Sequence, residues 1–395
     1  MRGRLVEAVW EHDPTVFAPP RYRRGCRYTA FIPSTLKDLP SIVPEVAGTI
    51  SAAEDAIRQL NAVAQPGLQP LARLLLRSES IASSKVEGMQ VDARTLARAE
   101  ARSDLGYSIG TEAGEVLANI DAMQLAVDEA TTAEALTLDH LLSTQRALLA
   151  RAVNADRVAG VVRTQQNWIG GNDYNPCGAA FVPPPPEHVT PLLDDLVAFC
   201  NDESLPPLAQ AALAHAQFET IHPFVDGNGR TGRGLVQMVL RRRGIAPDYV
   251  PPISVVLAAD KGRYIEGLIA FREGRDNEWL ETFAVAAARA AELAASYLIQ
   301  VRELQATWRE QLAAVGVRSD AAAWRIIDVL PAHPIISTPV AVEAIGRTKA
   351  VVHQAVEQLV EAGVLLPLSS GKRNRQWEAA GLFDLSADFE ALGPR

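Results

Sequence analysis

The residues from 222 to 233 are the part of this sequence whose types and spacing could do chemistry. The run Gly227–Gly229 allows backbone angles that turn several N–H groups toward one point. It stands where a helical pattern begins, so the helix dipole also favours an anion there. Arg230 and Arg233 are three positions apart, hence on one face of that helix, and both side chains can hold phosphate oxygens. The segment therefore predicts a site for a phosphate group.

Two flanking side chains extend this site. Asp226 supplies a carboxylate beside the anion-binding turn, which suits a Mg²⁺ ion that bridges phosphates. His222 ends the preceding helical pattern and could accept a proton from an attacking hydroxyl. Each residue alone has an ordinary structural explanation, such as a turn or a solvated helix face, but their occurrence within one short segment favours chemistry. A phosphate chain, a metal and a base together predict transfer of part of a nucleotide.

The stretch His222–Arg233 resembles the signature of the Fic/Doc family, HxFx(D/E)GNGRxxR, at every specified position. Residues 214–221 resemble the helix that leads into that signature. The resemblance implies a helical fold that uses ATP and Mg²⁺ to transfer AMP to a Ser, Thr or Tyr hydroxyl of a target protein. It implies that His222 is the base, that Asp226 binds Mg²⁺ and that Phe224 anchors the loop in the core. The nucleotide-binding residues that it implies are Gly227, Asn228, Gly229, Arg230, Arg233 and Tyr264.

Residues 163–182 predict a β-hairpin, because residues that favour extended structure surround the turn formers at 170–173. This hairpin resembles the family's flap, which docks an extended segment of the target by strand addition beside the active site. The alternative is a hairpin with a purely structural role.

A further motif lies far upstream, where Ser83 and Glu87 resemble the family's inhibitory motif, (S/T)xxxE(G/N). The two residues are four positions apart and share one face of a predicted helix. The resemblance implies that Glu87 forms a bidentate pair with Arg233 in the place of the γ-phosphate. ATP would then bind with its α-phosphate misplaced for attack, which by itself can slow a reaction by orders of magnitude. Taken alone, this short pattern is usually just the end of a helix.

Apolar residues recur at helical spacing along most of the chain. The pattern predicts helices over 46–61, 68–86, 111–130, 136–150, 189–201, 208–221, from the signature to 243, 262–272 and 279–304. The first thirty residues, which contain several prolines and a basic cluster, predict an extended arm.

After residue 317 the pattern changes. It predicts three short helices over 321–330, 338–345 and 348–361, a strand over 364–368 and a return strand from 376. Three helices followed by a basic hairpin are typical of a winged helix-turn-helix. Over residues 346–376, five basic residues stand against two acidic ones, and the candidate DNA contacts are Lys349, Lys372, Arg373 and Arg375. The alternative is a winged helix that mediates protein contacts or a homodimer.

The composition bounds the remaining possibilities. The 395 residues include 38 Lys and Arg against 47 Asp and Glu, a net charge of −9, which argues against a protein that coats nucleic acid or anionic lipid over its whole surface. The three cysteines show no CxxC spacing, so neither a disulfide framework nor a zinc site is expected, and a reducing cytoplasm is the simpler compartment. The apolar run Phe283–Ile299 contains Arg289 and Glu292, which favours a packed helix over a membrane span.

These observations predict a mainly α fold, in which a helical Fic core carries a β-hairpin flap and a C-terminal winged helix-turn-helix domain follows. The expected division is an N-terminal helical region with the inhibitory helix over 1–110, the catalytic core over 111–305 and the winged helix over 318–385. The predicted function is an autoinhibited protein adenylyltransferase. Two alternatives stay open: a DNA-binding regulator whose core senses nucleotide, and an enzyme that removes AMP from a modified protein with Glu87 orienting the water.

Overall fold

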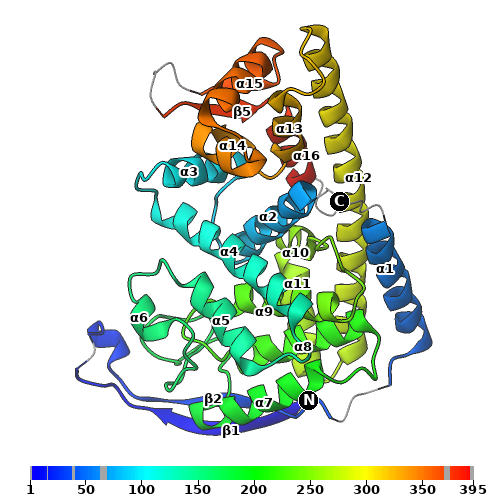
Figure 1. Ribbon diagram of the computed structural model, residues 1–395. Helices are drawn as coiled ribbons and strands as arrows, with labels where there is room; N and C mark the ends of the chain where they lie inside the picture. The colour runs from blue at the N-terminus through cyan, green and yellow to red at the C-terminus, as the bar shows by residue number, and fades with distance from the viewer. Residues whose placement is uncertain (1, 16, 38–40, 63–68, 369–373, 392–395) are drawn as a thin grey trace. The chain divides into compact units, whose positions relative to one another are not determined.

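The computed structural model describes residues 2–15, 17–37, 41–62, 69–368 and 374–391. The chain forms two compact units, each assembled from three stretches. The first unit comprises residues 1–52, 125–244 and 262–285, and the second comprises residues 53–124, 245–261 and 286–395. Both units contain residues of helices α1 (Pro44–Ala62), α4 (Thr111–Thr132) and α12 (Asp276–Ala314), which Figure 1 labels. The three-part division expected from the sequence stays a prediction.

The first unit contains the helices on either side of the segment 222–233. They are α5 (Leu138–Leu148), α6 (Ala155–Val158), α7 (Val189–Cys200), α8 (Pro207–Ile221), α9 (Asn228–Arg242) and α11 (Lys261–Arg272). Pro207 opens α8, where its missing N–H leaves no helical hydrogen bond broken. Every later residue of α8 is buried, as expected for a helix that is largely alanine and apolar all round.

Helices α8 and α9 pack closely because α9 has a glycine at the contact. A Cβ atom added at Gly232 would lie 2.9 Å from Phe218 Cδ1 and 2.5 Å from Glu219 Oε1. Gly232 occupies a position that the signature leaves unspecified, so it is the packing in this chain that requires a residue without a side chain.

The N-terminal stretch is a two-stranded sheet rather than a simple extended arm. Strand β1 (Gly3–Trp10) runs antiparallel to β2 (Cys26–Pro33), with Gly3 opposite Pro33 and Trp10 opposite Cys26 (Figure 1). Pro14, Pro19 and Pro20 lie between the two strands, where they break no ladder hydrogen bond, and Pro33 is the last residue of β2. Near its C-terminal end, β2 also contacts residue 182, because the Phe31 N–H donates to the Val182 carbonyl at 2.9 Å.

Residues 163–182 form a loop with a single bridge, between Ile169 and Phe181, so the predicted two-stranded hairpin is wrong in extent. Side-chain hydrogen bonds satisfy backbone groups that would pair with a second strand in a hairpin. The Asn172 Oδ1 accepts the N–H groups of Tyr174 and Asn175 at 2.9 and 3.0 Å, and the Trp168 indole donates to the Asn172 carbonyl at 2.6 Å. Asparagine side chains that bind nearby backbone groups favour turns over strands in this way.

Cys26 and Cys177 form a disulfide, which contradicts the expectation that the cysteines stay unpaired. The bridge joins the first residue of β2 to the loop that follows Asn175, with 6.0 Å between the two Cα atoms. Cys200 is the unpaired cysteine and is buried in α7. The argument from cysteine spacing to a reducing compartment therefore fails, because a disulfide needs no short spacing.

The second unit is built on α2 (Gln69–Val86) and extends through α3 (Ala93–Asp104) and α10 (Ile253–Ala259). Helix α2 carries polar residues that are nonetheless buried and paired. Glu79, only 1% exposed, accepts the Ser254 N–H at 2.8 Å and the Ser254 hydroxyl at 2.6 Å. Arg77 forms an ion pair with Glu100 of α3. Hydrogen-bonded charges of this kind fix how helices pack against one another.

The C-terminal part of the second unit combines short helices with a small sheet. The helices are α13 (Ala322–Val329), α14 (Thr338–Ile345), α15 (Lys349–Glu361) and α16 (Leu382–Ala391). The strands are β3 (Ile335–Ser337), β4 (Leu365–Pro367) and β5 (Gln376–Ala379), in the order β3-β5-β4 with antiparallel pairing. The sequence predicted α13–α15, β4 and the start of β5, but it missed β3 and α16. Assignment of this part to the winged-helix class stays a prediction.

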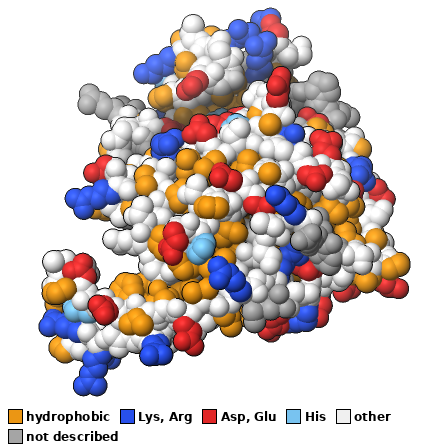
Figure 2. All heavy atoms as spheres, turned by 90° about the horizontal axis from the view of Figure 1, so that it is seen from below, with side chains coloured by type: hydrophobic (Ala, Val, Ile, Leu, Met, Phe, Trp, Pro, Cys, Tyr) orange, Lys and Arg blue, Asp and Glu red, His pale blue; other side chains and the backbone are white. Residues whose placement is uncertain are grey.

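Within the described ranges, α12 is the one helix that is long and apolar enough to cross a membrane by length and composition. More than half of its apolar stretch is buried, and a core helix of a globular protein can have the same length and composition. On the face that Figure 2 shows, acidic and basic side chains are interspersed, and no extended surface of one sign is visible.

Candidate active site

The site begins at His222, which ends helix α8 in a left-handed conformation with φ of 49° and ψ of 61°. Its N–H still donates to the Phe218 carbonyl at 2.8 Å, so the chain leaves the helix only at this residue. A left-handed residue other than glycine is disfavoured by about 1–2 kcal/mol. Such a conformation persists where surrounding contacts hold it, and it often marks a functional position.

The loop after His222 is closed by one side chain. Asn228, the first residue of α9, accepts the Phe224 N–H through Oδ1 at 2.8 Å and donates from Nδ2 to the Phe224 carbonyl at 2.9 Å. The Phe224 ring is fully buried and lies 6.0 Å from the Phe218 ring, which confirms that it anchors the loop in the core. Both polar atoms of the Asn228 amide are thus engaged by the loop itself, so its predicted contact with a phosphate stays a proposal.

The turn between loop and helix presents the predicted carboxylate. Asp226 is exposed, and its Oδ1 accepts the Gly227 N–H at 2.6 Å and lies 3.7 Å from Arg230 Nη2. Gly227 adopts a φ of 80°, and a Cβ atom there would lie 2.8 Å from Leu148 Cδ2, so the turn requires glycine. Within the described ranges, no group of three or more His, Cys, Asp or Glu side chains could hold a metal ion. A single exposed carboxylate beside an anion site nevertheless fits Mg²⁺, which commonly takes one or two carboxylates together with substrate phosphates.

The two predicted arginines lie on the first turns of α9 and are almost completely buried. Arg230 is 4% exposed and Arg233 is 2% exposed, and Gly229 precedes them at the helix N-terminus. The helix dipole favours negative charge at this end, and two guanidinium groups add to it. The segment 227–233 therefore combines backbone N–H groups, a helix N-terminus and two buried cations, which is the chemistry of a phosphate-binding site.

Three residues that the sequence did not mark support this loop from outside the signature. Arg163 donates from Nε to the His222 carbonyl at 2.9 Å, and Asn167 donates from Nδ2 to the His222 and Phe224 carbonyls at 3.2 and 3.0 Å. Gln145 of α5 donates to the Asp226 carbonyl at 3.1 Å. All three bind backbone carbonyls, which every residue has, so no spacing of residue types could have identified them.

Tyr264 lies in α11, and its hydroxyl is 2.9 Å from His215 Nε2 of α8. The tyrosine is 5% exposed, and its ring is 6.2 Å from that of Trp279. The structure thus gives Tyr264 a place in a buried aromatic cluster, and its predicted contact with adenine stays a proposal.

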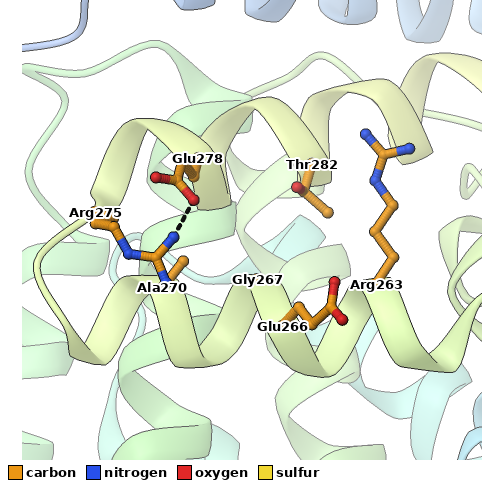
Figure 3. A pocket seen from close by; sticks show the side chains of 7 residues that line it. All are labelled: Arg263, Glu266, Gly267, Ala270, Arg275, Glu278 and Thr282. Atoms are coloured by element: carbon orange, nitrogen blue, oxygen red, sulfur yellow. Dashed lines mark hydrogen bonds and ion pairs between the residues drawn. The ribbon is translucent and has the colours of Figure 1, made fainter.

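A separate groove of about 310 Å³ lies between the exposed face of α11 and the start of α12 (Figure 3). None of its lining residues belongs to the signature. Four of them are charged, namely Arg263, Glu266, Arg275 and Glu278, and the others are Gly267, Ala270 and Thr282. Arg275 is already paired with Glu278 and with Glu273, so its charge is satisfied within the protein. This groove is distinct from the phosphate-binding segment.

The remaining predicted residues lie in the second unit. Ser83 is fully buried in α2, whereas Glu87 is exposed and follows the end of that helix, where its N–H donates to the Ser84 carbonyl at 3.1 Å. Lys349 is exposed at the start of α15. Arg375 lies over the Trp377 ring at 5.1 Å, and the candidate DNA contacts Lys372 and Arg373 fall outside the described residues.

Known proteins resemble this chain over the same segment. Residues 135–240 match the model of the Fic/DOC family. Residues 48–128 match the model of the Fic/DOC family N-terminal region. The Fic/DOC match contains the whole loop from His222 to Arg233 and the supporting residues Gln145, Arg163 and Asn167.

Curated relatives align with part of the chain. The protein adenylyltransferase fic-1 of Caenorhabditis elegans is 38% identical over 120 residues, 29% of this chain and 21% of the relative. The protein adenylyltransferase Fic of Drosophila virilis is 33% identical over 171 residues, 41% of this chain and 33% of the relative. The matched stretches thus span between a fifth and a third of the length of these relatives.

Solved structures resemble the fold. A Fic family protein from Desulfovibrio desulfuricans G20 aligns with a TM-score of 0.52 and 19% identity over 87% of this chain and 98% of its own. A Fic domain containing signaling protein from Bacteroides thetaiotaomicron VPI-5482 aligns with a TM-score of 0.51 and 22% identity over 62% of this chain and 95% of its own. The mainly helical fold with small sheets is thus one that Fic proteins share.

Proposed function

We propose that this protein is an adenylyltransferase that moves AMP from ATP to a hydroxyl of a protein target. The observation that carries the proposal is the left-handed His222, six positions before the start of α9, whose first turns hold two buried arginines. The names of the curated relatives support the same reaction. The hydroxyl oxygen attacks the α-phosphorus, the bond from that phosphorus to the bridging oxygen breaks, and pyrophosphate leaves.

The residues of the loop divide the work of this reaction. His222 takes the proton of the attacking hydroxyl as the bond to phosphorus forms. Arg230 and Arg233 bind the phosphate oxygens, on which negative charge builds up in the transition state, together with the N–H groups of segment 227–229. Tyr264 contacts the adenine, and Asn228 contributes to the α-phosphate site. The loop 163–182 docks an extended segment of the target.

Asp226 is the residue of this site that would hold Mg²⁺. Its carboxylate is exposed on the turn that leads into the phosphate-binding helix. When bound, the ion would neutralise charge on the phosphate chain of ATP.

Ser83 and Glu87 form the inhibitory element in this proposal. Glu87 competes with the outer phosphate of ATP for Arg233, so that bound ATP has its α-phosphate misplaced. The position of Glu87 directly after the end of α2 supports a role that depends on how that helix ends.

The test measures label transfer from α-labelled ATP in the presence of Mg²⁺. We expect weak labelling by the natural protein, strong labelling by Glu87→Gly and none by Glu87→Gly with His222→Ala. His353→Ala in the Glu87→Gly background is the matched control, since His353 is an exposed histidine on α15. Equal labelling by the variants with and without His222 would exclude it as the base.

We also infer that residues 318–385 form a winged helix-turn-helix that binds nucleic acid. The order α13-β3-α14-α15-β4-β5 and the antiparallel sheet support this proposal, as does the exposed Lys349 at the start of α15. The test is a gel shift at low and high salt with Lys349→Ala and Arg375→Ala, and Arg318→Ala as an exposed control. Salt-sensitive binding that only the first two changes weaken is the expected result, and no binding at low salt would refute the proposal.

A further inference from the structure

The backbone of His222 is held by two side chains from a different part of the chain. Its carbonyl oxygen accepts hydrogen bonds from Arg163 Nε at 2.9 Å and from Asn167 Nδ2 at 3.2 Å. The carbonyl of a left-handed residue points away from the direction that would continue the helix, so it needs partners outside α8. These two donors supply them, and thereby fix the orientation of the peptide group from which the His222 side chain projects.

Arg163 is an unusual residue for such a role because it is a buried cation that binds backbone only. It is 3% exposed, and its guanidinium donates also to the carbonyls of Gln165 and Pro184 at 3.0 and 2.6 Å. Its own N–H donates to the Pro223 carbonyl at 2.9 Å. No carboxylate in the part of the chain that the structure describes forms an ion pair with it. Burial lowers the pKa of Arg163 to about 10, with Glu187 opposing that shift, so the group stays charged at neutral pH.

Asn167 also binds the turn at His222, through its side-chain amide. Its Nδ2 group bridges the carbonyls of His222 and Phe224, the residues on either side of Pro223. The backbone of Asn167 is in turn held, because Gln166 Nε2 donates to the Asn167 carbonyl at 2.9 Å and to the Pro183 carbonyl at 3.0 Å. Arg163 and Asn167, at the two ends of the stretch 163–167, therefore both hold the His222 turn, and Arg163 and Gln166 join the stretch to Pro184 and Pro183.

We propose that Arg163 and Asn167 are positioning residues, which set the placement of the His222 imidazole and couple it to the loop that docks the target. The proposal rests on the proposed function, in which His222 is the base. A base acts only within hydrogen-bond reach of the proton it removes, and a misplacement of about 1 Å can lower a rate by about 10²-fold. Neither residue touches the phosphate-binding segment, so their loss acts on the rate of transfer and leaves the affinity for ATP unchanged.

The test uses Asn167→Ala and Asn167→Asp in the active Glu87→Gly background. Asn167→Asp keeps the shape of the side chain but replaces the donating NH₂ by an oxygen. Asn154→Ala is the matched control, since Asn154 is an exposed asparagine before α6 whose side chain makes no cap hydrogen bond. We expect both Asn167 variants to lower kcat at least about tenfold with KM for ATP within about twofold of the parent, and Asn154→Ala to change neither.

Arg163→Lys tests the second donor, because lysine keeps the charge but cannot supply the several fixed donors of a guanidinium. We expect the same loss of kcat from it. A melting temperature measured for each variant separates misplacement of His222 from loss of the fold. If Arg163→Lys is unstable, the two Asn167 variants alone test the proposal. Parent-like kcat in both Asn167 variants, or an equal loss of ATP affinity, would overturn the proposal. An NMR titration of the His222 ring provides a readout that does not depend on activity. An unshifted ring signal in Asn167→Asp contradicts the positioning role. The proposed function fails separately, if the Glu87→Gly parent transfers no AMP.

Discussion

Reduction of the disulfide between Cys26 and Cys177 is expected to destabilise the protein without changing its native fold. The bridge closes a segment of 151 residues in the unfolded chain, and the chain-entropy relation for a loop of that size gives about 5 kcal/mol at 25 °C. This figure counts only the freedom that the unfolded chain regains when the bridge is broken. It is an upper value, because residual structure in the unfolded chain reduces it.

Contacts around the bridge explain why the fold should survive. Asn175 Nδ2 donates to the Tyr22 carbonyl at 2.9 Å, and the rings of Tyr22 and Tyr174 stack at 5.1 Å. Trp10 and Trp168 meet edge to face at 5.4 Å. These contacts hold the N-terminal sheet against the loop 163–182 whether or not the sulfur atoms are joined. The expected loss is therefore in the free energy of unfolding, with the circular dichroism spectrum of the folded protein unchanged.

Thiol counting and urea unfolding together provide the assay. The unreduced protein should show no rapidly reacting thiol when folded and one when denatured, because Cys200 is 1% exposed and burial raises the pKa of its thiol to about 12. After reduction, three thiols should react in the denatured protein. Dithiothreitol should lower the urea midpoint of the natural protein and of Cys200→Ser, whereas Cys26→Ser with Cys177→Ser should already have the lower midpoint and respond to no reductant.

Two results would refute this reasoning. Three reactive thiols in the denatured, unreduced protein would mean that the bridge does not form. One thiol, but an unchanged urea midpoint on reduction, would mean that the unfolded chain gains no freedom from the broken bridge. The first result would also restore the argument that the cysteines belong to a reducing compartment.

Three further predictions concern packing and pH. Gly232→Ala should lower the free energy of unfolding by about 1–3 kcal/mol in urea titrations, because its methyl group would overlap the Phe218 ring at the contact of α8 with α9; a neutral effect would mean that the two helices can separate without loss. Ser254→Ala should lower it by about 1.5–3 kcal/mol, since the variant leaves the buried Glu79 carboxylate without a 2.6 Å hydrogen bond. The pKa of His333 is lowered to about 4 by burial and by two arginines of α2, so the unfolded chain binds a proton that the folded chain does not, and stability should fall by about 1.4 kcal/mol per unit as pH drops from about 6.5 to 4. His333→Gln should flatten that part of the stability profile, and an unchanged slope would contradict the assignment.

Local regularity made the helices and the loop 222–233 predictable. A helix must repeat its apolar residues every three or four positions, so α2, α4, α8 and α15 are visible without any knowledge of their partners. The loop 222–233 is visible because the function that we propose for it requires particular residue types at particular spacings. The structure agrees on where the first helix ends and the second begins, at His222 and Asn228.

Features that depend on distant partners were missed or misjudged. The 163–182 stretch has the composition of a hairpin, yet Asn172 and Trp168 satisfy its backbone in place of a second strand. Cys26 and Cys177 are 151 positions apart, and nothing near either of them indicates its partner. Strand β1 was read as part of an arm, because its partner β2 lies beyond a run of prolines.

The side chains that support His222 could not have been predicted from any pattern of residue types. Arg163 and Asn167 act on backbone carbonyls, so their partners could be any residues at all, and the partner's identity carries no signal. What selects the contact is the left-handed turn, which aims the His222 carbonyl toward the stretch 163–167. The left-handed conformation of His222 is itself disfavoured unless Arg163 and Asn167 donate to its carbonyl. His222, its left-handed turn and the two donors therefore depend on one another, and a change at Asn167 should alter the position of His222 although residues 222–233 are unchanged.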